Sequence, residues 1–176
     1  TYNYDDGTGT NVGPEDSNEA VITVNQVAGP HIDDQDPDGG NRSDTDEGPA
    51  GDNVVEIDSA GQGATIQFEN IVTNSGNGPD TFDVLLSNDS FPAGTTYRLL
   101  QADGSTPMLD SNGDADTAPD TGVLQAGETF VVILEVQLPD GASGDNGGAG
   151  WAITKTARSD FDPSVQDTTT DRLNSI

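Results

Sequence analysis

Short apolar runs that alternate with polar residues at every second position constrain this fold more than any other feature. Residues 129–138 are the clearest case, because Phe130, Val132 and Leu134 begin a row of apolar side chains on one face of an extended strand. No window carries apolar residues at helical spacing over several turns, so the chain is predicted to be all-β. The other runs that read as strands are residues 65–73, 81–86, 96–100, 151–157 and 165–173.

Turns rich in glycine and asparagine separate these runs. Residues 74–78 read N-S-G-N-G, residues 125–128 read Q-A-G-E, and residues 139–141 read P-D-G. Glycine adopts a positive φ at low cost, which tight turns between antiparallel strands require. Strands separated by such turns at about ten-residue spacing indicate an antiparallel β-sandwich.

A large excess of acidic residues limits the partners. The 176 residues include 32 Asp and Glu against 5 Lys and Arg, which gives a formal net charge of -27. This charge must lie on the surface, and it excludes nucleic acid and anionic membrane surfaces as partners. No apolar run reaches the roughly 20 residues that span a bilayer. The chain has no cysteine for disulfides or thiolate metal sites, and its scarcity of Lys suggests an extracellular or salt-adapted protein.

The N-terminal third differs from the rest of the chain. Residues 19–27 read as one strand rich in β-branched residues, and residues 28–53 read as an acidic linker with almost no apolar side chain. We therefore expect an N-terminal extension over residues 1–53 and a compact β-sandwich over residues 54–176.

The predicted strand at residues 19–27 has two possible roles. It either folds back as the first strand of its own domain, or it is donated to the sheet edge of another copy. In the second case Ala20, Ile22 and Val24 would be the donated side chains, and the acidic linker would give the strand its reach.

Four motifs occur in a fixed order and carry a family resemblance. They are T-N-S-G-N-G-P-D-T-F at 73–82, F-P-A-G at 91–94, P-D-T-G-V-L-Q-A-G-E-T-F at 119–130 and D-P-S-V-Q-D-T-T-T-D at 162–171. Residues 64–171 thereby resemble the Ig-like conserved-repeat domains of bacterial and archaeal surface proteins. The resemblance implies an Ig-like sandwich in a secreted or wall-associated protein that serves as a structural spacer or assembly module. The chain departs from the family in its single copy and its acidic N-terminal extension.

Two acidic clusters are candidate calcium sites, because oxygen ligands at alternating positions can surround a hard cation. The loop at residues 110–120 lacks the central glycine of an EF-hand, with Ala115 in its place. Either cluster could equally be a solvated polar loop. The candidate ligands are Asp110, Asn112, Asp114, Asp116 and Asp120 in that loop, and Asp33, Asp34, Asp36 and Asp38 in the linker.

Catalysis has little support in the sequence. The single histidine, His31, lies beside the acidic linker, and no G-x-S-x-G motif accompanies it. Paired carboxylates are abundant, but three Tyr and one Trp offer few surfaces on which a sugar could stack. We therefore expect that the protein is not an enzyme. Asn41 and Asn88 match the N-x-S/T glycosylation pattern, which also arises often by chance.

These features favour two functions. The first is a structural subunit of an extracellular filament or cell-surface fibre, stabilised by calcium and assembled head to tail with copies of itself by β-strand addition. The alternative is a calcium-dependent adhesin or glycan-binding module of a larger surface protein, with glycans or other surface proteins as partners. Filaments would favour the first function, and a stable monomer would favour the second.

Overall fold

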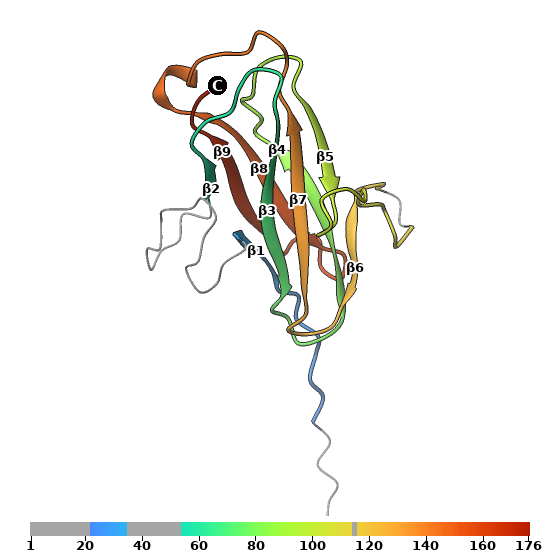
Figure 1. Ribbon diagram of the computed structural model, residues 1–176. Helices are drawn as coiled ribbons and strands as arrows, with labels where there is room; N and C mark the ends of the chain where they lie inside the picture. The colour runs from blue at the N-terminus through green and yellow to red at the C-terminus, as the bar shows by residue number, and fades with distance from the viewer. Residues whose placement is uncertain (1–21, 35–53, 114–115) are drawn as a thin grey trace, which may run out of the picture.

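Two β-sheets packed face to face make up the domain (Figure 1). The computed structural model describes residues 22–34, 54–113 and 116–176. Within these ranges the chain contains nine strands, one short 3-10 turn at Asn146–Gly148 (η1) and no α-helix. The prediction of an all-β sandwich is therefore confirmed.

The strand order is that of an immunoglobulin-type sandwich. The first sheet has the order β1-β3-β7-β5, and the second has the order β2-β9-β8-β4-β6. With β1, β3, β4, β5, β7, β8 and β9 taken as strands A to G, the sheets contain the A-B-E-D and G-F-C orders. All pairs are antiparallel except β2 with β9. The bounds are β1 Pro30–Asp34, β2 Val54–Ile57, β3 Thr65–Asn74, β4 Asp80–Ser87, β5 Thr96–Leu100, β6 Asp120–Leu124, β7 Thr129–Gln137, β8 Trp151–Ser159 and β9 Gln166–Leu173.

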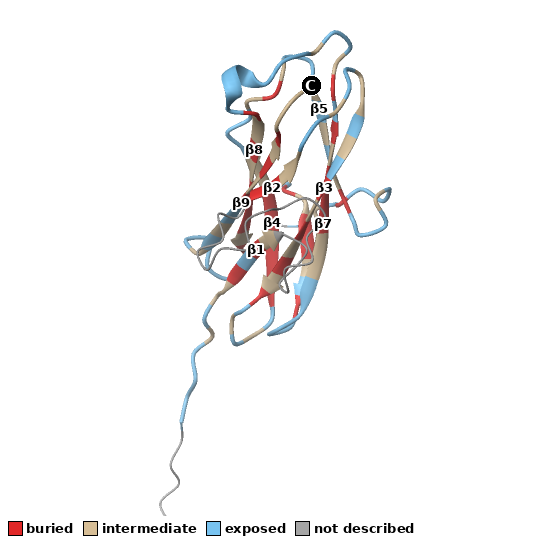
Figure 2. Cartoon of the chain, turned by 60° about the vertical axis from the view of Figure 1, so that its left-hand side comes forward, coloured by how far each residue is buried: buried red, intermediate tan, exposed pale blue. Residues whose placement is uncertain are grey.

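The core lies between the sheets and follows the alternation of the sequence. Figure 2 shows buried residues recurring along the central strands. On β7, Val132, Leu134 and Val136 are all fully buried. Burying an aliphatic side chain of this size contributes about 1.5–3 kcal/mol relative to leaving it exposed. The buried residues form two clusters, one around Phe82 and one around Phe68.

The first strand lies later in the chain than predicted. β1 starts at Pro30 and pairs with β3 over the whole of Pro30–Asp34, a stretch assigned to the acidic linker by the sequence pattern. Residues 22–29 pair with none of the strands that the structure describes, so this part of the predicted strand at 19–27 does not fold back as the first strand of its own domain; its donation to another copy stays a prediction. The reason is burial: Ile32 is 0% exposed, whereas the Ile and Val of residues 22–27 have no core to enter.

Candidate functional site

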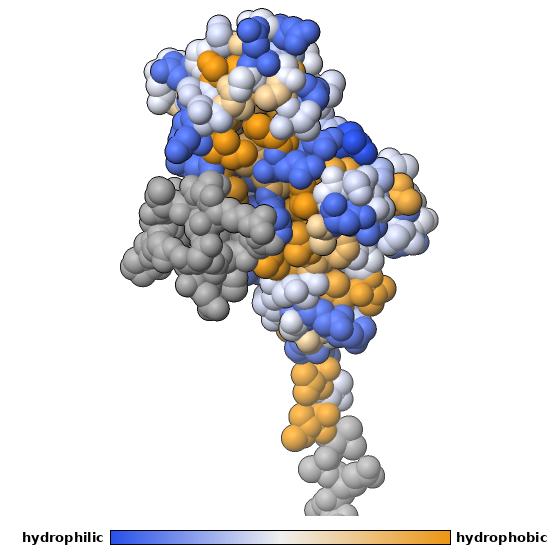
Figure 3. Space-filling model, in the orientation of Figure 1, coloured by the Kyte–Doolittle hydropathy of each residue, from blue (hydrophilic) through white to orange (hydrophobic). Residues whose placement is uncertain are grey.

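The N-terminal part of the described chain, residues 22–29, exposes a row of apolar side chains and is called the exit segment below. Ile22 is 85% exposed, Val24 76% and Val27 62%. Figure 3 shows hydrophobic atoms on the segment that runs away from the domain. Ile22 and Val24 are two of the three residues predicted for strand donation, and Ala20 lies outside the described residues. An extended, β-branched segment without a strand partner is suited to pairing with another sheet.

Hydrogen bonds fasten the base of the exit segment to the turn between β3 and β4. The Val27 amide donates to Asn77 Oδ1 at 2.7 Å, and Asn77 Nδ2 donates to the Asn25 carbonyl at 2.9 Å. Gln26 Nε2 donates to the Pro79 carbonyl at 2.7 Å. These bonds fix where the segment leaves the sandwich, and the exit segment projects beyond the end of the domain (Figure 1).

Gly29 allows this close approach. A Cβ atom at Gly29 would lie 2.6 Å from the backbone nitrogen of Gly76, which is closer than real Cβ contacts. The absence of a side chain at Gly29 therefore lets the exit segment lie against the turn.

An apolar groove of about 450 Å³ lies between β4 and β5 and is called the β4–β5 groove below. It exists because β6 covers only the first part of β4: the register ends at Asp83↔Asp120, and the Val84 amide donates to the Pro119 carbonyl. Beyond this point β4 pairs with β8 alone. The side chains that line the groove include Val84, Leu86, Leu99, Pro107, Met108 and Pro119.

The second wall of the groove is β5, which ends the first sheet. β5 pairs with β7 on one side. On its other side the Met108 amide donates to the Leu99 carbonyl at 2.9 Å, so the following loop covers the last part of the strand. The β4–β5 groove is thus an apolar channel flanked by strand edges that the described residues only partly fill.

Asp120, a predicted calcium ligand, organises the loop at residues 110–120 by accepting hydrogen bonds. Its carboxylate accepts from the amides of Asn112 at 3.1 Å and Gly122 at 2.6 Å, and from Ser111. Burial raises the pKa of Asp120, but these hydrogen bonds outweigh burial and hold the pKa below its ordinary value. Asp110 likewise accepts from the Gly113 amide at 2.9 Å.

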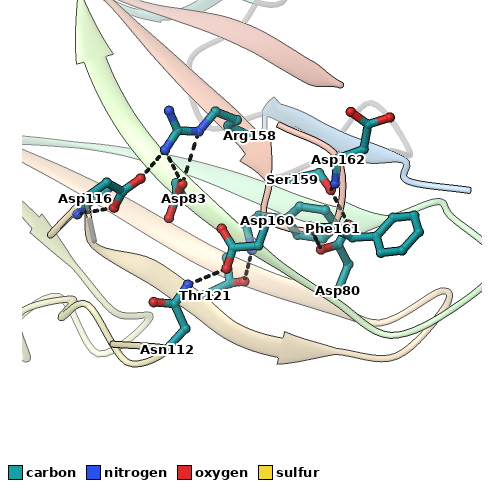
Figure 4. Close-up of polar contacts among 12 residues, drawn as sticks. Asp80, Asp83, Asn112, Asp116, Thr121, Arg158, Ser159, Asp160, Phe161 and Asp162 are labelled. Carbon is teal, nitrogen blue, oxygen red and sulfur yellow. Dashed lines mark hydrogen bonds and ion pairs between the residues drawn. The ribbon is translucent and has the colours of Figure 1, made fainter. Parts of the chain in front are cut away.

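Arg158 on β8 connects this loop to the second sheet. Its guanidinium lies between Asp83 on β4 and Asp116 of the loop (Figure 4), with Arg158 Nε 3.1 Å from Asp83 Oδ2. Asn112 Nδ2 donates to the carboxylate of Asp160 nearby. Desolvation by burial raises the pKa of Asp83 to about 6, although the hydrogen bond from Arg158 acts in the opposite direction. The sequence alone did not reveal this role of Arg158. The available signal was that basic residues are rare in this acidic chain, so each of them has many possible acidic partners.

The predicted calcium ligands that the structure describes have different partners and do not form one group. Asp116 contacts Arg158, and Asp120 accepts from its own loop. Asp33 lies on β1 and Asp34 is the last residue of that strand, while Asp36, Asp38 and Asp114 lie outside the described residues. Among residues 22–34, 54–113 and 116–176, no three His, Asp or Glu side chains form a group that could hold a metal ion. Calcium binding stays a prediction of the sequence.

Of the remaining candidate residues, His31 and Asn88 are described by the structure, and both are exposed. Asn88 follows β4 with a φ of 51°, and its side chain donates to Thr154 Oγ1 at 3.3 Å. Asn41 lies outside the described residues, so glycosylation stays a prediction. His31 Nδ1 lies 3.0 Å from Asp167 Oδ2, and the His31 side chain is 51% exposed.

The strand order and these surfaces define the chain as an Ig-like β-sandwich domain with a projecting apolar segment. In the described part of the chain, no helix is long and apolar enough to cross a membrane. No family model and no curated protein matches the sequence. Comparison with solved structures instead finds similar folds.

The N-terminal domain of PorA is 14% identical, with a TM-score of 0.51 over 82% of this chain and 96% of that one. A family 123 glycoside hydrolase from Clostridium perfringens is 11% identical, with a TM-score of 0.44 over 69% of this chain and 22% of the hydrolase. The fimbrial subunit MyfA from Yersinia enterocolitica is 16% identical, with a TM-score of 0.35 over 69% of this chain and 90% of MyfA. At these identities the likeness to the PorA domain supports the fold alone.

Proposed function

We propose that this chain is a structural subunit of an extracellular filament or cell-surface fibre that assembles by β-strand addition between copies. The exit segment carries this proposal. It is extended, exposes Ile22, Val24 and Val27, and pairs with none of the strands that the structure describes. In strand addition, main-chain hydrogen bonds give affinity and alternate side chains fill pockets, which is the pattern that Ile22 and Val24 supply.

The β4–β5 groove is the acceptor that fits this segment best. A strand of six residues spans about 20 Å, and the groove offers apolar walls beside the unpaired side of β4. Its occupant is a second copy, because Asn77 and Gly29 fasten the base of the exit segment to the opposite end of its own β4. A contact between two different surfaces of one chain is heterologous and propagates into a fibre when its rotation does not close.

The acidic surface is compatible with this assembly outside the cell. A net charge of -27 keeps copies apart at low salt, so growth should require salt or divalent cations that screen the repulsion. Calcium, predicted from the loop at residues 110–120, would serve as such a cation.

Point variants of the full chain test strand addition. We expect the wild type to form filaments in negative-stain images, and the double variant Ile22→Asp, Val24→Asp to remain monomeric by size-exclusion chromatography. Val123→Asp is the matched control, because Val123 is 66% exposed and belongs to β6, not to the exit segment. It should still form filaments.

Two outcomes would reject the proposal. Filaments that persist in the double variant, or after truncation of residues 1–28, would exclude the exit segment as the donated strand. A wild type that stays monomeric in calcium and high salt would favour the alternative, an adhesin or glycan-binding module, which a glycan-array measurement would then address.

A further inference from the structure

Three polar side chains interrupt the apolar core at one point. Asn70 on β3, Lys155 on β8 and Asp171 on β9 are each 0% exposed. Lys155 is the single lysine of the chain, which otherwise has only four basic residues, all Arg. Lysine is almost never fully buried unless it is paired. The chain thus uses its one amine in the interior, where it is costly, and not on the highly acidic surface.

The three side chains occupy positions that face the core along their strands. Residues two positions away on the same strands are buried apolar side chains: Phe68 and Val72 on β3, Ile153 and Ala157 on β8, and Leu173 on β9. These neighbours belong to both of the buried clusters, so the polar group lies where the two clusters meet. Its surroundings are therefore apolar and closed to solvent.

Lys155 Nζ contacts both of its partners. It lies 2.8 Å from Asp171 Oδ2 and donates to Asn70 Oδ1. Asn70 belongs to the first sheet and Lys155 to the second, so this contact crosses the sandwich. Within the described chain, Asn70 Nδ2 and Asp171 Oδ1 are buried and have no hydrogen-bond partner. Buried polar atoms normally have a hydrogen-bond partner, so two such atoms without one beside the same amine require an explanation.

Burial also sets the protonation of the pair. Desolvation lowers the pKa of Lys155 and raises the pKa of Asp171, in each case against the attraction of the partner. Transfer of one proton from the ammonium to the carboxylate leaves a neutral amine and a neutral carboxylic acid without changing the net charge. A neutral lysine amine is a nucleophile, and a neutral carboxylic acid can donate a proton.

We infer that Lys155 and Asn70 condense into an intramolecular isopeptide bond that joins β8 to β3, with Asp171 as the catalytic acid and base. Lys155 Nζ attacks Asn70 Cγ, which forms the new C–N bond and a tetrahedral centre. Asp171 donates its proton to Asn70 Nδ2 and accepts one from Lys155 Nζ. The bond from Cγ to Nδ2 then breaks, and ammonia leaves. An amine and a carboxamide thus become a secondary amide and ammonia, and no oxidant or cofactor is consumed.

Asn70 is a better acyl donor for this reaction than Asp171. Its carbonyl oxygen is already polarised by Lys155 Nζ, and its Nδ2 is the orphan atom that the reaction would release. Condensation with Asp171 would release water instead and would leave Asn70 buried with no role. The apolar surroundings also protect the product from hydrolysis, because they exclude solvent from the amide.

Mass spectrometry of the full chain tests this bond. Cleavage before Asp residues should release residues 58–79 and 145–159 as one conjugate, lighter than the sum of the two peptides by one ammonia. The conjugate is the decisive readout, because Asn-Gly sequences such as Asn112-Gly113 can also lose ammonia by forming a succinimide. We expect no conjugate in Lys155→Met, Asn70→Ala or Asp171→Asn. Asn112→Ala, the matched control for Asn70→Ala, should retain the conjugate.

The digest of the wild-type protein tests the isopeptide bond even if a variant fails to fold. Separate, unmodified peptides from folded wild-type protein would overturn the inference. A conjugate of Lys155 with Asp171, formed by loss of water, would overturn the assignment of Asn70. The bond forms within one chain, so this result is independent of whether the protein assembles into filaments.

Discussion

Replacement of Ile32 by Ala tests whether β1 is part of the sandwich. Ile32 is 0% exposed and belongs to the core cluster around Phe82, although Asp33 and Asp34 follow it directly in the sequence. Ile→Ala removes three carbon groups, which at about 0.8 kcal/mol each gives a transfer cost of about 2.4 kcal/mol. The cavity left behind adds to this cost, so the expected loss in free energy of unfolding is about 2–5 kcal/mol.

Ile22→Ala is the matched control, since Ile22 is 85% exposed on the exit segment. It removes the same atoms and should change the free energy of unfolding by less than about 0.5 kcal/mol. Urea unfolding followed by Trp151 fluorescence, at a protein concentration where the chain is monomeric, measures both. A loss below about 0.5 kcal/mol for Ile32→Ala would refute the packing described for β1, and a large loss for Ile22→Ala would indicate that residues 19–27 fold back into the core of their own domain.

Three further predictions concern Asp83, the exit segment and the loop at residues 110–120. The raised pKa of Asp83 means that the folded state binds more protons than the unfolded state between pH about 4 and 6. Its contribution to stability is therefore present below pH about 4 and lost as pH rises through 6. In Asp83→Asn the free energy of unfolding, measured across this pH range, should decline less steeply. Gly29→Ala should displace the exit segment and reduce filament formation, whereas Gly61→Ala, where a Cβ meets nothing within 4 Å, should not. If residues 110–120 hold calcium, EDTA should lower Tm and added calcium should restore it; an unchanged Tm would leave the hydrogen bonds of Asp120 as the support of that loop.

The sequence pattern predicts strands well where apolar side chains recur along the strand. The prediction at residues 96–100 coincides with β5, and the prediction at residues 129–138 exceeds β7 by one residue. β1 was missed because Ile32 is its one apolar residue inside an acidic run. β6 was missed because it contains Gly122 and polar residues. Alternation detects a row of buried apolar side chains, and neither strand has one: Ile32 is the buried aliphatic residue of β1 and Leu124 that of β6, where the buried Asp120 and Thr121 are polar.

The sequence pattern was also limited for the exit segment and for the buried group around Lys155. The apolar residues of the exit segment were visible in sequence, but whether they enter a core depends on tertiary packing. Lys155 did carry a signal, because it alternates with Ile153 and Ala157 on a strand that was predicted. Its partners Asn70 and Asp171 lie on other strands, and only the pairing of β8 with β9 and the packing of the two sheets bring them together.

The exit segment and the C-terminus leave the sandwich at opposite ends (Figure 1). A pull on the exit segment would therefore act along β1, parallel to its neighbour β3. Backbone hydrogen bonds of an antiparallel pair run perpendicular to the strands. Tension would consequently shear all the bonds from Pro30↔Asn74 to Asp34↔Asn70 at once, and would not open them one after another. The short first strand would then act as a mechanical clamp, whose strength depends on the number of bonds loaded together.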